Sequence, residues 1–132
     1  MILPNGATVA VADGESLALF KNGGHGVDVS LSALAAPELA SGNAGGSHHS
    51  SAANPDDKTQ AEDGHAAASA AWLNKQVLDG KISSLLVIAA PRALGELRKH
   101  YHKALQAVLA GELAKDLSGH SMADIQAAVV AA

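Results

Sequence analysis

One short stretch of the chain constrains the fold more than any other. Residues 85–90 read LLVIAA, an almost unbroken apolar run that ends at Pro91. The run is far below the roughly 20 residues that a membrane-spanning helix needs, but it fits a central β-strand covered on both faces. Pro91 ends the strand and suits the first turn of a helix, where its missing N–H costs nothing. The sequence therefore predicts a buried strand followed directly by a helix.

The beginning of the chain predicts three antiparallel strands. Residues 7–12 and 16–20 are mainly apolar and flank Asp13-Gly14, a turn dipeptide, so they read as a hairpin. From about residue 27 to residue 34 apolar and polar residues alternate with a period of two, which predicts a third strand. A sheet of three strands needs a cover for one face, and the rest of the chain must supply it.

Residues 37–64 show no periodicity and are rich in Gly, Ser and Asn. Such residues cannot offset the entropy of ordering a segment, so we expect a mobile loop at about residues 41–64. A long helix is then predicted from near Gly64-His65 to Asp79, with Gly80 as its C-cap. Trp72 and Phe20 each lie within an apolar period and are expected to be core or half-buried residues.

The second half of the chain predicts two strand–helix units. The helix that starts at Pro91 is expected to reach residue 100, a short strand to follow at about residues 107–113, and a helix capped by Ser121 to close the chain from residue 122 to about residue 130. The predicted order is βββαβαβα in one domain of 132 residues. This order favours a mixed five-stranded sheet with helices on its faces, the ribonuclease-H-like topology.

Three blocks of sequence resemble a known family. Residues 3–6 (LPNG) with 11–14 (VADG), residues 86–98 (LVIAAPRALGELR) and residues 112–118 (ELAKDLS) are similar to the bacterial host-attachment protein family. The resemblance covers nearly the whole chain. It implies a relationship to the central domain of archaeal and eukaryotic peptide release factors, and hence the fold of that domain.

The resemblance also bears on catalysis. In those release factors the loop between the third strand and the first long helix holds a Gly-Gly-Gln motif that reaches the peptidyl-transfer centre. The equivalent loop here holds Gly45-Gly46-Ser47, so the glutamine that positions a water for ester hydrolysis is missing. Gly45 and Gly46 otherwise read as an ordinary flexible loop. No catalytic residue is therefore assigned, and the chain is not expected to be an enzyme.

Histidines and carboxylates raise the question of a metal site. His48, His49 and His65 have four acids nearby in the sequence: Asp56, Asp57, Glu62 and Asp63. The spacing fits no recognised metal motif, so we expect neither a metal nor another cofactor. His65 is expected to cap or orient the start of the long helix. Asp13 alone cannot supply the several carboxylates that a two-metal nuclease needs, and a role in the turn explains it.

The best candidate for binding is the start of the helix at Pro91, whose backbone N–H groups can hold an anion. Five cations on or near that helix are the candidate contacts for an anion or a partner: Arg92, Arg98, Lys99, Lys103 and Lys115. The alternative is a solvated helix face whose cations answer the helix dipole. The net charge of −4 makes any contact with RNA weak and salt-sensitive.

Two functions follow from these observations. The first is a non-enzymatic interaction protein of the host-attachment family. The second is an RNA- or ribosome-associated factor or a remote peptidyl-tRNA hydrolase. The chain has no Cys and begins without a basic leader or a long apolar run, which favours a cytoplasmic protein that does not contact membranes.

Overall fold

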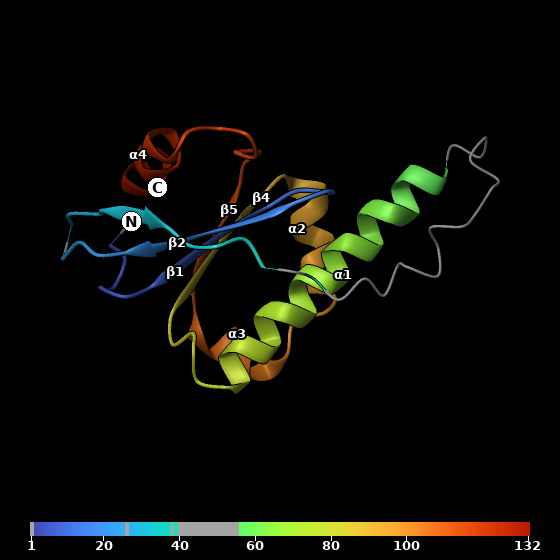
Figure 1. The fold of residues 1–132 in the computed structure, drawn as a ribbon, viewed down its shortest axis with the longest axis horizontal. Coiled ribbons are helices and arrows are strands. Elements are labelled where there is room, and N and C mark those ends of the chain that lie inside the picture. The colour runs from blue at the N-terminus through green and yellow to red at the C-terminus, as the bar shows by residue number, and fades with distance from the viewer. Residues whose placement is uncertain (1, 26, 38, 40–55) are drawn as a thin grey trace.

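The computed structural model describes residues 2–25, 27–37, 39 and 56–132. A mixed sheet lies between helices in this part of the chain (Figure 1). The strands are β1 (Thr8–Ala12), β2 (Leu17–Asn22), β3 (Leu31–Ala33), β4 (Leu85–Ala89) and β5 (Leu109–Ala114). The helices are α1 (Asp56–Leu78), α2 (Pro91–Arg98), α3 (Lys103–Val108) and α4 (Met122–Ala131).

The five strands form one sheet in the order β3-β2-β1-β4-β5. β1 pairs with β2 and β2 with β3 in antiparallel fashion, whereas β1 with β4 and β4 with β5 are parallel. The predicted hairpin and the predicted mixed five-stranded sheet of a single α/β domain are both confirmed.

Strand β4 lies inside the sheet, as its apolar run predicts. All five of its residues are buried. Because side chains alternate along a strand, Val87 packs among residues of α1, α2 and α3 on one face, and Ile88 packs beside α4 on the other. Pro91 is the first residue of α2, as expected. The two faces of the sheet therefore carry two separate hydrophobic clusters, with Trp72 half-buried against the first and Phe20 inside the second.

The third strand is shorter than predicted. β3 covers only Leu31–Ala33, and Val27, the first residue of the predicted strand, is 70% exposed. The cause is the buried side chain of Asn22, whose Oδ1 accepts hydrogen bonds from the backbone N–H groups of Gly24 and Ser30. These bonds hold the connection in a turn around the amide, so it cannot extend the ladder. The strand predicted over residues 27–34 is therefore wrong over its first half.

The long helix begins earlier than predicted. α1 starts at Asp56, so a loop that extends to Gly64 is wrong over residues 56–64, and residues 41–55 lie outside the described part. In Figure 1 the first turns of α1 extend past the ends of the strands, so they need no apolar face and give no apolar period. The end of α1 is confirmed, with Gly80 at a φ of +77° just after it.

One helix is missing from the predicted order. α3 lies between α2 and β5, α2 ends at Arg98 before the predicted residue 100, and the observed order is βββαβααβα. α3 has six residues and buries only Leu105, which is too little for a helical pattern to show in the sequence. Its start is fixed by the side chain of His102, which accepts a hydrogen bond from the Ala104 N–H. Helix α4 and its Ser121 cap are as predicted.

Candidate functional site

The carboxyl ends of three strands meet at one edge of the sheet. Ala12 of β1 and Ala114 of β5 both lie opposite Ala89 of β4, so the residues that follow these three strands share that edge. Ligands of open α/β sheets bind at such an edge. The residues brought there by the strands include Asp13, Pro91 and Lys115. This carboxyl edge is therefore the first place to look for a site.

Arg92 at this edge is already engaged. Its Nη1 lies 3.4 Å from Oε1 of Glu62, and its Nη2 lies 3.0 Å from Oδ1 of Asp63. The two carboxylates come from α1, so Arg92 ties the start of α2 to the N-terminal half of α1. The side chain is 55% exposed, but its charge is balanced by two acids. An anion at the start of α2 would therefore have to compete with two carboxylates for Arg92.

Asp13 serves the β1–β2 turn. Its Oδ1 accepts hydrogen bonds from the backbone N–H groups of Glu15 and Ser16 and from the Ser16 hydroxyl. Partial burial raises the pKa of Asp13, whereas these hydrogen bonds and one from Ser118 lower it. The hydrogen bonds together have the larger effect, so the pKa of Asp13 lies below its usual value. The carboxylate is a structural acceptor at this turn.

We expect Asp13→Ala to destabilise the protein by about 1 kcal/mol at pH 6, because the turn loses its acceptor. A carboxylate with a lowered pKa in the folded state stabilises above its unfolded pKa and stops doing so as pH falls through the folded value. The difference from wild type should therefore shrink below about pH 4. Urea melts of wild type and Asp13→Ala at pH 6 and below about pH 4 measure this difference in unfolding free energy. A difference that stays the same at both pH values would contradict the role assigned to the charge.

Arg98 is held by strand β5. Its Nε and Nη2 donate to the carboxylate of Glu112, with the shortest distance 2.9 Å, and the hydroxyl of Tyr101 donates to the same carboxylate at 3.2 Å. Burial, and then the charge and hydrogen bond of Glu112, raise the pKa of Tyr101. The hydrogen bond and charge of Glu112 raise the pKa of Arg98. This network joins α2 and the following segment to the edge strand.

The remaining candidate cations differ from one another. Lys99 pairs with Glu96 in α2, which raises the pKa of Lys99 and lowers that of Glu96. Lys103 and Lys115 have exposed side chains, and in the described ranges neither has an acidic partner. Lys115 follows the carboxyl end of β5. Lys103 is the first residue of α3, the helix that leads to the amino end of β5. The five candidate cations therefore do not gather into one patch.

A residue that sequence reasoning missed organises the segment between α2 and α3. Asn74 of α1 donates from Nδ2 to the His100 carbonyl at 2.8 Å and accepts at Oδ1 from the His102 N–H at 2.9 Å. The amide therefore matches both backbone groups of this segment and fixes it against α1. Its only sign in the sequence is a polar residue beside the apolar stripe of α1.

The predicted histidine roles are only partly described. His65 lies inside α1, nine residues after its start, so the expectation that it caps the helix is wrong; its Nδ1 is 3.5 Å from the Ser69 hydroxyl. Gly45, Gly46, His48 and His49 lie outside the described residues. Over the part of the chain that the structure describes, no three His, Asp or Glu side chains are grouped to hold a metal ion. No helix in that part is long and apolar enough to cross a bilayer.

Comparison with known proteins identifies the family. The family model described as bacterial archaeo-eukaryotic release factor family 12 matches residues 6–129, nearly the whole chain. No curated protein matches the chain. The family match places the chain in this family and confirms the relationship to release factors that the motifs predict.

Proposed function

We propose that this chain, which belongs to the bacterial archaeo-eukaryotic release factor family 12, acts in translation by binding the ribosome or its RNA. The observation that carries the proposal is the family match over residues 6–129. A match of this extent covers all five strands, helices α1 to α3 and most of α4, and so does not depend on a single local motif. The resemblance to this family therefore extends across the folded domain.

The engagement of three carboxylates at the carboxyl edge and one missing glutamine favour binding without hydrolysis. Asp13, the carboxylate that follows β1, is occupied by the turn, and Glu62 and Asp63 are occupied by Arg92. A general base needs a carboxylate free to take a proton from water. The sequence Gly45-Gly46-Ser47 also lacks the glutamine that the release-factor resemblance would require. Both observations support a non-enzymatic interaction role.

The remaining predictions from the sequence fit within this proposal. A ribosome-bound protein acts in the cytoplasm, which is the location that the sequence favours. A role in attachment to host cells would then be indirect, through the synthesis of other proteins. The anion contact predicted for Arg92, Arg98 and Lys99 would require each side chain to leave its present carboxylate partner.

The test is sedimentation of the purified protein with purified bacterial ribosomes at about 50 mM and about 200 mM salt. We expect the protein to move with the ribosomes at low salt and to leave them at high salt, because contacts with phosphates release counterions. A protein that stays at the top of the gradient at both concentrations would refute the proposal. Peptidyl-tRNA incubated with the protein should remain intact, and its accelerated hydrolysis would refute the non-enzymatic role.

A further inference from the structure

Charge is distributed unevenly between the two ends of the sheet. Five carboxylates lie on the residues at or next to the carboxyl edge: Asp13, Glu15, Glu62, Asp63 and Asp116. Among the described residues, Arg92 and Lys115 lie at that edge, and Lys99 is near enough for the charge of Asp63 to raise its pKa, so the carboxylates there still outnumber the cations. This end of the molecule is therefore acidic, although it is the end at which open α/β sheets bind ligands. A polyanion is repelled there.

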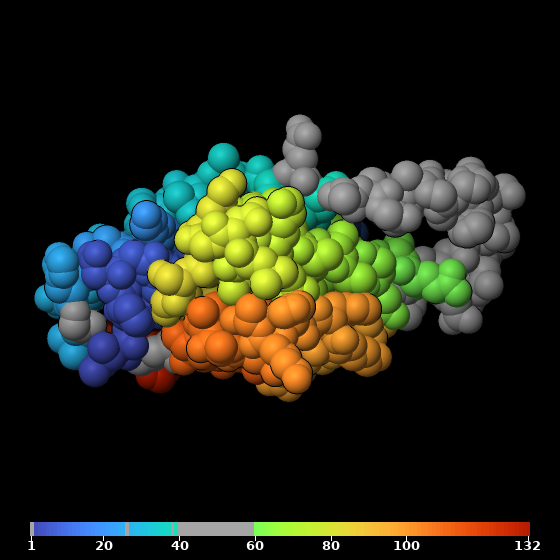
Figure 2. Space-filling view, turned by 90° about the horizontal axis from the view of Figure 1, so that it is seen from below, coloured from blue at the N-terminus to red at the C-terminus, as the bar shows by residue number. Residues whose placement is uncertain are grey.

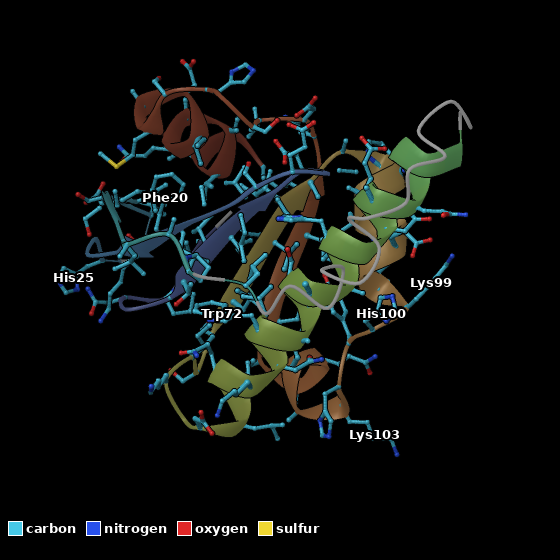
Figure 3. The ribbon with its side chains drawn as sticks, turned by 45° about the vertical axis from the view of Figure 1, so that its right-hand side comes forward. Phe20, His25, Trp72, Lys99, His100 and Lys103 are labelled. Atoms are coloured by element: carbon cyan, nitrogen blue, oxygen red, sulfur yellow. The ribbon has the colours of Figure 1, made fainter. Side chains whose placement is uncertain are left out.

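The surface at the amino ends of β4 and β5, opposite the carboxyl edge, is basic. Residues 74–82, at the end of α1 and before β4, and residues 100–105, at the start of α3, contain three lysines and one carboxylate. We call Lys75, Lys81, His102 and Lys103 the amino-edge surface, because they lie before the amino ends of β4 and β5. Figure 2 shows the end of α1 and the segment from α2 to α3 side by side on one face, and Figure 3 shows Lys103 at this end.

Hydrogen bonds hold the three segments of this surface together. Asn74 bonds to both His100 and His102, and the Lys81 N–H donates to the Gln76 carbonyl at 2.9 Å. α1 also packs directly against α3. The backbones that carry the three lysines are therefore fixed relative to one another, and binding need not order them.

The lysines are available to an anion. Lys81 and Lys103 are exposed and have no acidic partner in the part of the chain described by the structure. Lys75 pairs with Asp79 at 3.0 Å, but its side chain is 72% exposed, and an exposed pair one helical turn apart is weak. A phosphate can replace Asp79 as the partner of Lys75.

We infer that the amino-edge surface contacts the phosphate backbone of ribosomal RNA, and this inference rests on the proposed function. The uneven charge orients the molecule, since the basic end approaches the polyanion while the acidic carboxyl edge, where α1 begins, points away. Lys103 is the one residue of the sequence-predicted cation set that belongs to this surface. The other four lie elsewhere or are paired.

The inference is tested by charge reversal at matched positions. Lys103→Glu and Lys115→Glu change the net charge equally at exposed lysines on opposite ends of the sheet. The slope of log affinity against log salt is negative, and we expect Lys103→Glu to reduce its magnitude by about 1 and the double variant K81E/K103E to reduce it by about 2. Lys115→Glu should leave the slope unchanged. The readouts are ribosome sedimentation and filter retention of purified ribosomal RNA over a salt series.

The outcomes separate this inference from the proposed function. Wild-type protein that binds no ribosomes at low salt refutes the proposed function and the inference with it. Wild-type protein that binds ribosomes while K81E/K103E binds as well as wild type refutes only the inference. Binding of ribosomes without salt dependence or RNA retention would identify a ribosomal protein as the contact and also overturn it. Thermal melts that match wild type show that each variant is folded.

Discussion

Val87→Asp and Ile88→Asp are each expected to unfold the protein. Both side chains are fully buried, one on each face of β4. A carboxylate at either position would lie in an apolar cluster without a partner, and the cost of burying an unpaired charge exceeds about 4 kcal/mol. Because a folded domain is stabilised by only about 5–15 kcal/mol, a cost of this size together with the lost packing removes much of that stability. Expression in soluble form and circular dichroism melts measure the effect.

The matched control is Ser32→Asp in β3. Ser32 is an exposed strand residue, so the same charge remains in water there, and the melting temperature should change little. If either β4 variant melts cooperatively near the wild-type temperature, one face of β4 is open to water. Testing both positions matters, because each reports on a different face of the sheet.

Asn22→Asp is expected to destabilise the protein by about 3 kcal/mol or more, through buried polar groups left without partners. Asn22 is fully buried, and its Nδ2 donates to the carbonyls of Leu3 and Pro4 at 2.9 Å and 3.2 Å. Its Oδ1 accepts from the N–H groups of Gly24 and Ser30. Aspartate is nearly the same shape but places a second acceptor against two carbonyl oxygens. The N-terminal segment and the β2–β3 connection lose their common anchor.

The pH dependence of this variant gives a second readout. Burial and the two carbonyls disfavour the charged form, so the pKa of the new carboxyl is raised in the folded state. A raised carboxyl pKa destabilises above the folded value, and the loss is relieved as pH falls through it, because the protonated group can donate again. Urea melts from pH 7 to pH 4 should show the deficit shrinking.

Asn74→Asp is the control for the chemical change itself. Asn74 makes two similar backbone bonds but lies partly exposed between α1 and the segment before α3. Water can solvate its new carboxylate and the freed His100 carbonyl, so the loss should be at most about 1 kcal/mol. Equal losses in Asn22→Asp and Asn74→Asp would show that burial is not what makes Asn22 important.

Much of the fold was predictable because the relevant signals are local. The apolar run of β4, the helix start at Pro91, the turn at Asp13-Gly14 and the cap at Ser121 each depend on residues a few positions apart. The predictions are wrong for helical segments that bury few side chains, because such segments have no periodic pattern of apolar residues. The first turns of α1 need no apolar face, and α3 buries only one residue, so neither leaves a periodic pattern.

The candidate site, unlike the fold, depends mainly on contacts between residues that are distant in the sequence. The sequence gives the positions of Arg92, Arg98 and Lys99, but not their partners. Glu62 and Asp63 are about 30 positions from Arg92, and Glu112 is 14 from Arg98, so these ion pairs depend on how α1 and β5 pack beside α2. A row of cations along the chain is therefore not a cationic surface in the fold.

The sequence by itself determined the class of the domain, the position of the buried strand β4 and its kinship with release factors, because these depend on local patterns and motifs. Only the tertiary structure decided which charges are paired and which end of the molecule is basic. The physical reason is that electrostatic partners are set by distance in space. Asn22 and Asn74 make the same point, since each is an ordinary polar residue until the fold brings backbone groups from other segments to its amide.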